Sequence, residues 1–198
     1  MEKGFYEKIC KSFGGSLPAS SLSEEAVKLL NSKTRVIQLN KGEYLQLEGD
    51  VSRFLGVVDS GLLRIFYRKA GEEMTEFLAC ENEVFYDCES FFRQMPSRRY
   101  IQMLEPSVLY LCTKTDLDDL CRQNKEIRFF YRKLTELLLL QMKHKTLDCV
   151  FEPAKVKFEN LAARNQQYVL RVPSIFIASY LGVTPETLSR IRSTKDMK

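Results

Sequence analysis

The sequence predicts an α+β protein in which an N-terminal double-stranded β-roll of the jelly-roll type is followed by a long helix and a small C-terminal helical domain. Three observations support this prediction. Short β-rich runs separated by glycine turns recur between residues 35 and 112, which is typical of an all-β roll or sandwich. Residues 125–149 contain neither glycine nor proline, and residues 174–193 have the pattern of two helices around a tight turn.

The β-roll is expected to occupy residues 1–124, with a short helix at residues 22–33 ahead of its strands. Strands are predicted for the runs VIQL, YLQLE, FLGVVD and LLRIFYRK, which are followed in turn by Gly42, Gly49, Gly61 and Gly71. In the last run polar and apolar residues alternate imperfectly. The assignment therefore depends on turn spacing and on the content of β-branched and aromatic residues.

A long helix is predicted for residues 125–150, after a short helix capped by Thr113. At a rise of 1.5 Å per residue, it would be about 37 Å long. A stripe that repeats every three or four residues along it comprises Ile127, Phe130, Leu134, Leu138 and Gln141. We expect one face of this helix to pack on the roll and another to pair with a second copy in a homodimer, so that the stripe is the dimer interface. Packing on the roll alone is the alternative.

The third segment, residues 151–198, begins with a helix at residues 154–164 after Pro153 and carries the whole net positive charge. Residues 1–150 contain 22 basic and 22 acidic side chains, whereas residues 151–198 contain 8 basic and 4 acidic ones. A basic excess confined to one end of a chain is typical of a module that binds a polyanion, although a solvated surface can have the same pattern.

Two helices around a tight turn are predicted for SIFIASYLGVTPETLSRIRS, residues 174–193. Gly182 can adopt the left-handed conformation that ends the first helix, while Thr184 and Pro185 suit the start of the second. Their shared apolar positions are Ile177, Ala178, Leu181, Val183, Leu188 and Ile191. The arrangement resembles a helix-turn-helix, which places its second helix in the DNA major groove. A plain helical hairpin is the alternative.

The segment PETLSRIR resembles the recognition helix of the Crp/Fnr family of transcription regulators, in which a glutamate and, four residues on, an arginine contact base edges. The resemblance gives these roles to Glu186 and Arg190, because a carboxylate can accept from cytosine N4 and a guanidinium can donate two hydrogen bonds to guanine. The competing interpretation is an i, i+4 ion pair on an exposed helix.

Further DNA contacts are expected around this helix, from side chains and from a helix N-terminus that can bind phosphate oxygens. The candidate DNA-binding residues besides the Glu–Arg pair are Ser174, Thr184, Pro185, Ser189, Arg192 and Lys195, with Arg171 and Lys198 as additional phosphate contacts. No β-wing is evident after the recognition helix.

The resemblance extends over nearly the whole chain and implies a cyclic-nucleotide-binding-like sensor roll followed by a dimerisation helix. In the family, a Gly-Glu pair and a later arginine hold the nucleotide. The run VFYDCESFFRQMPSRRYIQ aligns without gaps and sets Tyr86 at the glycine, Asp87 at the ribose-binding glutamate and Ser97 at the phosphate-binding arginine. A tyrosine ring obstructs backbone approach to phosphate and serine supplies no charge, so cAMP binding is not expected.

Two basic residues, Arg98 and Arg99, follow Ser97 directly. Arg99 has the same strand parity as Ser97. Two alternatives therefore remain. The effector site either has no charged residue at the phosphate position, or it is displaced and binds an anion through Arg99.

No cofactor or metal is expected. The six cysteines are widely spaced and His144 is the single histidine, a pattern that fits small apolar core side chains better than zinc, haem or iron–sulfur ligands. An enzyme is disfavoured, because no paired carboxylates on a recognisable scaffold and no glycine-rich phosphate loop are present.

A cytoplasmic protein without a membrane partner is expected, because no apolar run approaches the about 18 residues of a membrane span and residues 1–12 do not resemble a signal peptide. Double-stranded DNA and a second copy of the chain are the predicted partners, RNA polymerase is a further candidate, and the sequence identifies no effector. The alternative function is a ligand-binding or protein-binding roll whose C-terminal helices form a protein interface. Salt-dependent DNA binding separates the two hypotheses.

Overall fold

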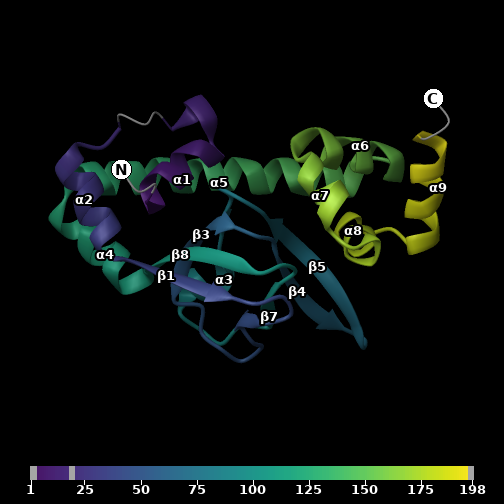
Figure 1. Cartoon of the computed structure of the whole chain (residues 1–198), viewed down its shortest axis with the longest axis horizontal. Helices are drawn as coiled ribbons and strands as arrows, with labels where there is room; N and C mark the ends of the chain where they lie inside the picture. The colour runs from purple at the N-terminus through teal and green to yellow at the C-terminus, as the bar shows by residue number, and fades with distance from the viewer. Residues whose placement is uncertain (1–3, 18–20, 196–198) are drawn as a thin grey trace.

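The long helix α5 (Lys125–Phe151) organises the molecule. The structure is a computed structural model that describes residues 4–17 and 21–195. Figure 1 shows the β-roll on one side of α5, with the N-terminal helices at one end of the molecule and the C-terminal helices at the other. This arrangement confirms the predicted α+β fold class.

The roll consists of two four-stranded antiparallel sheets, with strand orders β1-β8-β3-β6 and β2-β7-β4-β5. The strands are β1 (Thr34–Leu39), β2 (Tyr44–Gln46), β3 (Phe54–Ser60), β4 (Leu63–Lys69), β5 (Glu72–Ala79), β6 (Val84–Phe85), β7 (Arg99–Met103) and β8 (Ser107–Thr113). The first four begin within two residues of the runs predicted from turn spacing.

The two sheets enclose an apolar interior. Its fully buried members come from strands of both sheets and include Val58, Leu63, Ile65, Phe85, Ile101, Met103 and Leu109. Gly56 in β3 is required by this packing, because a Cβ atom there would lie 2.3 Å from the ring of Phe85.

Helical segments precede the strands of the roll, interrupt them between β6 and β7, and connect the roll to α5. They are α1 (Phe5–Ser12), the 3₁₀ turn η1 (Gly14–Ser16), α2 (Glu24–Ser32), α3 (Cys88–Arg93) between β6 and β7, and α4 (Lys114–Gln123). The Asn124 side chain caps α5 by accepting from the backbone amides of Glu126 and Ile127. The Glu126 carboxylate in turn accepts from the Ser23 amide at 2.7 Å, which ties the start of α5 to the start of α2.

The predicted dimer stripe on α5 needs a correction. Ile127, Phe130, Leu134 and Leu138 are at most 7 % exposed within the single chain, in one cluster with apolar residues of α1, α2, α4 and β3. They cannot meet a second copy while they fill this core, and of the predicted stripe Gln141 alone is exposed. A different face of α5 carries exposed apolar side chains, namely Phe129, Leu139, Leu140, Leu147, Val150 and Phe151.

Four short helices follow α5: α6 (Ala154–Arg164), α7 (Gln166–Arg171), α8 (Ser174–Leu181) and α9 (Pro185–Lys195). Their buried side chains form one cluster that also contains Leu62, Leu78, Cys80 and Leu104 of the roll. The small helical unit therefore shares its core with the β domain. Over the described part of the chain, no helix combines the length and apolarity that crossing a membrane requires.

Candidate nucleic-acid interface

The turn between α8 and α9 has the geometry that the sequence predicted. Gly182 is in the left-handed region, with φ 66° and ψ 37°, and no atom would contact an added Cβ, so conformation alone favours glycine there. The amide of Val183 donates to the Ala178 carbonyl at 3.0 Å, which closes the end of α8. At the start of α9, the Thr184 hydroxyl accepts from the Thr187 amide at 3.2 Å.

An apolar core fixes the angle between the two helices. Ile177, Ala178 and Leu181 of α8 and Leu188 of α9 are at most 4 % exposed. They pack with Phe158 and Leu161 of α6, while Val183 and Ile191 are partly buried against the same cluster.

The outer face of α9 is polar. Thr184, Pro185, Glu186, Ser189 and Arg190 are all exposed. Hydrogen bonds to its own backbone amide and to Thr184 lower the pKa of the Glu186 carboxyl, with a smaller contribution from the positive charge of Arg190. The predicted i, i+4 attraction between Glu186 and Arg190 is thus present. Both side chains are also exposed to solvent.

Arg192 differs from the other predicted contacts on α9. Its guanidinium donates to the Ser174 hydroxyl at 2.7 Å and lies 5.7 Å from the centroid of the Phe158 ring. Two further guanidinium nitrogens, Nε and Nη2, are buried without a hydrogen-bond partner. Arg192 and Ser174 are therefore brought together, and their mutual bond ties α9 to the start of α8.

Arg171 is not available for the phosphate contact that was predicted for it. Its guanidinium bonds to Glu81 at 2.7 Å and also pairs with Glu105, and both carboxylates belong to the roll. These bonds raise the pKa of Arg171. Burial acts to raise the pKa of Glu81, but hydrogen bonds from Arg171 and from backbone amides outweigh it and lower that pKa to about 2. We call this triad, Arg171 with Glu81 and Glu105, the junction clamp.

The remaining predicted phosphate contacts are the lysines near the end of the chain. Lys198 and the side chain of Lys195 lie outside the described residues.

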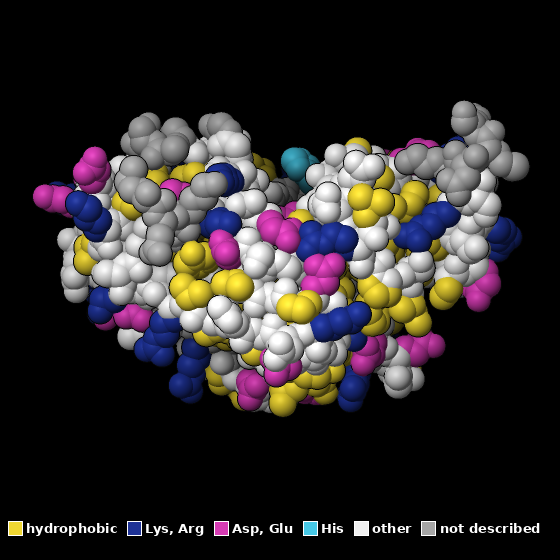
Figure 2. All heavy atoms as spheres, viewed as in Figure 1, with side chains coloured by type: hydrophobic (Ala, Val, Ile, Leu, Met, Phe, Trp, Pro, Cys, Tyr) yellow, Lys and Arg dark blue, Asp and Glu magenta, His cyan; other side chains and the backbone are white. Residues whose placement is uncertain are grey.

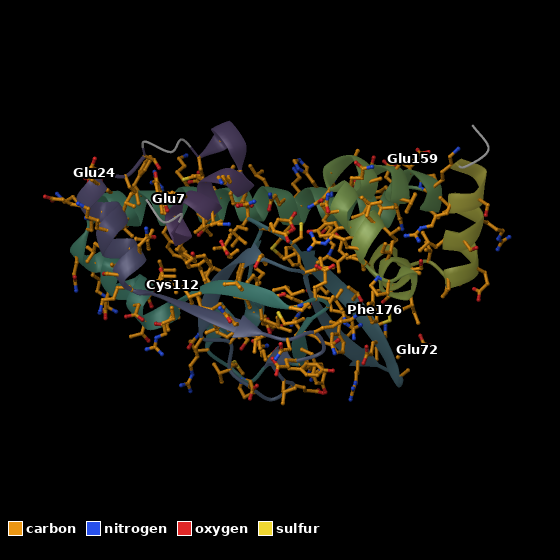
Figure 3. The ribbon with its side chains drawn as sticks, viewed as in Figure 1. Glu7, Glu24, Glu72, Cys112, Glu159 and Phe176 are labelled. Carbon is orange, nitrogen blue, oxygen red and sulfur yellow. The ribbon has the colours of Figure 1, made fainter. Side chains whose placement is uncertain are left out.

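The sequence did not predict that α8 would dock on strand β5. The Ser179 hydroxyl donates to the Glu73 carbonyl at 3.0 Å and accepts from the Thr75 amide at 2.8 Å, so it pairs with the backbone of β5. The Arg64 guanidinium lies between two rings, 3.9 Å from the centroid of Phe66 and 3.7 Å from that of Phe176. Figure 3 shows Phe176 where α8 meets the roll. No local pattern marks these residues, because the contacts join segments about 100 positions apart.

Opposite charges lie side by side where the roll meets the C-terminal helices on the face shown in Figure 2. Elsewhere on this face basic and acidic side chains are interspersed over the roll. The roll itself therefore presents no extended basic surface on this side, in keeping with its balanced charge.

The predicted effector pocket is occupied by the chain's own groups. Asp87 is 1 % exposed, and its carboxylate accepts from the Ser97 hydroxyl, from the Gln46 amide at 3.1 Å and from the Ser90 backbone amide at 3.3 Å. In the same place the Tyr86 ring packs edge-on against Phe91, with centroids 5.8 Å apart. Asp87 and Ser97, two of the three positions aligned with nucleotide-binding residues, are thus brought together and hydrogen-bonded to each other.

The arginines after Ser97 diverge. Arg98 is exposed, whereas Arg99 reaches towards Asp87 and lies within 3.8 Å of it. Arg99 also pairs with Glu76 at 2.5 Å and with Glu89 at 3.6 Å. Burial acts to lower the pKa of Arg99, but the bonds and charges of these carboxylates raise it above its ordinary value. Because three carboxylates already surround this guanidinium, it offers little net positive charge to an anion.

Three of the six cysteines, Cys10, Cys80 and Cys112, are buried as small apolar side chains, whereas Cys149 is exposed. Burial raises the pKa of the Cys80 and Cys112 thiols to about 12. Within the described ranges, no three histidine, cysteine, aspartate or glutamate side chains are grouped so that they could hold a metal ion.

Comparison with known proteins identifies both the roll and the overall fold. Residues 36–124 match the family model of the cyclic nucleotide-binding domain. FixK2 from Bradyrhizobium japonicum has a similar structure, with a TM-score of 0.71 and 16 % sequence identity over 83 % of this chain and 85 % of that one. No curated protein matches the sequence.

Two more solved structures are similar over most of their length. A CooA mutant from Carboxydothermus hydrogenoformans has a TM-score of 0.63 and 18 % identity over 89 % of this chain and 82 % of that one. The Thermus thermophilus catabolite activator protein has a TM-score of 0.56 and 20 % identity over 88 % of this chain and 84 % of that one. Roll, long helix and C-terminal helices therefore form the Crp/Fnr-type fold that the sequence resemblance implied.

Proposed function

We propose that this chain, with its Crp/Fnr-type fold, is a DNA-binding transcription regulator that acts as a homodimer and inserts α9 into the major groove. The observation that carries the proposal is the division of α9 into two faces. Leu188 is buried in the helical core, while Glu186 and Arg190 are exposed on the same helix. A carboxylate and a guanidinium one turn apart can contact a cytosine and a guanine.

Arrangement of the basic residues supports a nucleic-acid partner. The excess of positive charge lies entirely in residues 151–198, and one of these basic groups, Arg171, is used by the junction clamp. Proteins that bind DNA gain most of their sequence-independent affinity from such charges, through release of counterions.

The homodimer is proposed to form through the exposed apolar face of α5. Phe129, Leu140 and Leu147 are 51, 50 and 43 % exposed, and their spacing of 11 and 7 residues keeps them on one side of the helix. A second copy related by a twofold axis would bury this face and present two copies of α9, as recognition of an imperfect palindrome requires.

The roll is proposed to sense an effector other than cAMP. Asp87 and Ser97 satisfy each other where the family places its ribose and phosphate contacts, so a cyclic nucleotide would have to break existing bonds and would meet a serine at the position of the phosphate-binding arginine.

Selection from random double-stranded DNA with the full chain tests the proposal. We expect an enriched site with two half-sites whose centres are about 34 Å apart, bound more weakly as salt rises. Recovery of unselected sequences with no salt dependence would contradict it. The alternative function, in which the C-terminal helices are a protein interface, predicts this negative result.

A further inference from the structure

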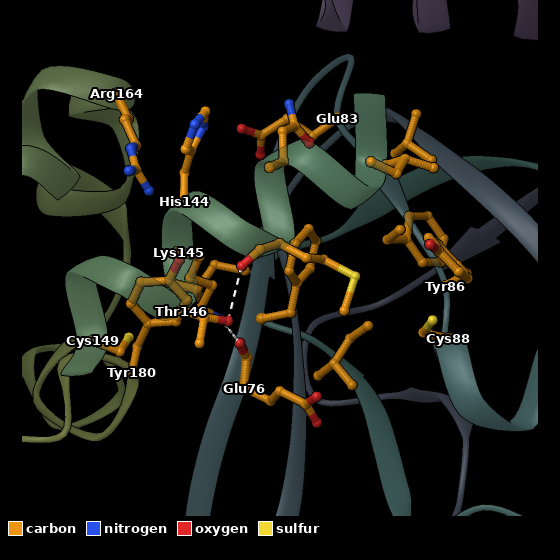
Figure 4. A pocket seen from close by; sticks show the side chains of 18 of the residues that line it. Glu76, Glu83, Tyr86, Cys88, His144, Lys145, Thr146, Cys149, Arg164 and Tyr180 are labelled. Atoms are coloured by element: carbon orange, nitrogen blue, oxygen red, sulfur yellow. Dashed lines mark hydrogen bonds between the residues drawn. The ribbon is translucent and has the colours of Figure 1, made fainter. Parts of the chain in front are cut away.

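A cavity of about 680 Å³ lies between the roll, α5 and the C-terminal helices (Figure 4). This volume is in the range of sites that hold small organic ligands. Its walls are mostly apolar and include Leu78, Val84, Phe85, Leu138, Met142 and Leu161. Figure 4 shows Tyr86 and Cys88 at one end and Lys145, Cys149 and Tyr180 at the other. The second end therefore reaches α8.

Nearly all charged groups around the cavity are held by other side chains of the protein. Glu76 pairs with Arg99, and Arg164 pairs with Asp148. Glu83 accepts from the Tyr168 hydroxyl and from the side-chain amide of Asn165. Asp87 is satisfied by Ser97 and Gln46.

Lys145 is the exception among the described residues that line the cavity. Its ammonium group donates to the backbone carbonyl of Glu76 and lies 4.2 Å from the centroid of the Tyr180 ring. Among the described residues no carboxylate lies within ion-pair distance of it, and the charge of Glu76 acts on it only from further away. Burial lowers the pKa of Lys145 to about 8, so the amine is still largely charged at neutral pH and lacks a counter-ion in an apolar place.

We propose that this cavity binds a small amphipathic monoanion, whose apolar body fills the space between the roll and α5 and whose carboxylate pairs with Lys145. The size and apolar walls select the body, and the single uncompensated cation selects one negative charge. Asp87 also lines this cavity, but its carboxylate already accepts from Ser97 and Gln46, so the anion is expected at Lys145 and not at the positions aligned with the nucleotide contacts.

Position gives such a ligand a regulatory consequence, an inference that rests on the proposed function. Tyr180 belongs to α8, and Glu76 belongs to β5, on which α8 docks. A carboxylate at Lys145 therefore contacts the junction that sets the orientation of the DNA-reading helices, and the ligand acts as the effector.

Binding of a matched pair of probes tests the site in the absence of DNA. The probes are 2-naphthoate and its neutral counterpart 2-naphthamide, titrated calorimetrically into the full chain at pH 7. We expect naphthoate to bind about tenfold to a hundredfold more tightly, the range that a hydrogen-bonded charge typically contributes. Lys145→Met should remove this preference, and Lys143→Met, which changes an exposed lysine on the same helix, should keep it.

Equal affinity for the two probes, no binding of either at millimolar concentration, or an unchanged preference in Lys145→Met would each overturn the proposal. Thermal melts establish that the variants are folded, and Lys145→Gln provides a second neutral replacement. Because DNA is absent, loss of DNA binding in a separate assay would refute the proposed function without affecting the ligand site.

Discussion

Arg190 and Arg192 are two positions apart on α9, yet they have different surroundings. Arg192 turns back to Ser174 and Phe158, whereas Arg190 stays exposed one turn after Glu186. Composition cannot separate two such arginines. Helical periodicity can, because a residue two positions from another points about 200° away from it around the axis.

Replacement of Arg190 by alanine should leave the fold unchanged and relax specificity at one base pair in each half-site. Loss of a bidentate contact to guanine costs about 1 to 3 kcal/mol per half-site. The measurement is affinity for cognate and random DNA at several salt concentrations. Arg192→Ala is the matched control and should instead lower the melting temperature, because it removes the bond that ties α9 to Ser174. Equal loss on cognate and random DNA for Arg190→Ala would mean that this residue reads no base.

The hydrogen bonds of Asp87 predict that cAMP does not bind to this protein. Its carboxylate is filled by Ser97, Gln46 and Ser90, so millimolar cAMP should change neither the melting temperature nor DNA affinity. A ligand at 100 times its dissociation constant would stabilise the fold by about 2.7 kcal/mol, which thermal shift assays detect easily. Such a shift would refute the conclusion that this site is closed to cyclic nucleotides.

Lys145→Met should stabilise the protein at pH 7 by at most about 3.5 kcal/mol, since a pKa difference of one corresponds to about 1.4 kcal/mol. Burial lowers the pKa of Lys145 from 10.5 to about 8, with Glu76, Cys149 and Arg164 as the charged or titratable groups that face it. The folded state thus binds the proton less tightly than the unfolded chain. The penalty is complete below pH 8 and is relieved as pH rises towards 10.5.

Urea titrations of wild type and variant between pH 7 and 10 measure this difference. The advantage of Lys145→Met should shrink with rising pH, and Lys143→Met should show no such trend. An advantage that is absent at pH 7, or that grows with pH, would contradict the burial of a charged amine.

Local sequence signals predicted the positions of most of the helices and of the first four strands. Glycine turns located β1 to β4, and absence of glycine and proline located α5 to within two residues of its end. The α6 helix, Ala154–Arg164, coincides with its predicted range. The α1 helix was missed, although Phe5, Tyr6 and Ile9 make it amphipathic, because eight residues provide only two turns of periodicity.

Missing α1 had a consequence for α5. The sequence predicted that one face of α5 packs on the roll and that the stripe from Ile127 to Gln141 pairs with a second copy. Without α1 in that prediction, the cover that α1, α2 and α4 provide for Ile127 to Leu138 was not foreseen. In a helix with two apolar faces, the apolar residues of each face repeat every three or four positions. The sequence alone does not say which face belongs to which neighbour.

The two faces of α5 make opposite predictions. Leu140→Asp, at a side chain that is 50 % exposed, should convert a dimer of twice 23.1 kDa into a folded monomer in sedimentation experiments. Leu134→Asp, at a side chain that is 2 % exposed, should unfold the chain, because a buried unpaired charge costs about 4 kcal/mol or more. A dimer that survives Leu140→Asp would place the interface elsewhere.

For the whole molecule, the decisive feature is that roll and helical unit share a core. Tyr168 of α7 is 6 % exposed, and its hydroxyl donates to the Leu78 carbonyl of β5 at 2.8 Å. The junction clamp joins the same helix to the roll through Arg171. Charge and composition predicted the position of the helical unit along the chain, but the docked arrangement depends on pairs such as Arg171 and Glu81 that are 90 residues apart.

A shared core predicts one cooperative unfolding transition for the wild-type chain in scanning calorimetry. Arg171→Ala should weaken the junction, because it leaves Glu81 and Glu105 as unpaired neighbours of like charge. The clamp is partly exposed, so about 1 to 2 kcal/mol is expected after allowance for solvent screening. The C-terminal helices should then unfold in a separate transition at lower temperature, ahead of the roll. Arg93→Ala, which breaks the exposed pair with Glu89 inside α3, is the control and should keep a single transition. Two transitions in the wild type would show that the helical unit folds independently. An Arg171→Ala profile identical to that of Arg93→Ala would show that the apolar contacts of Leu78 and Tyr168 hold the junction without the clamp.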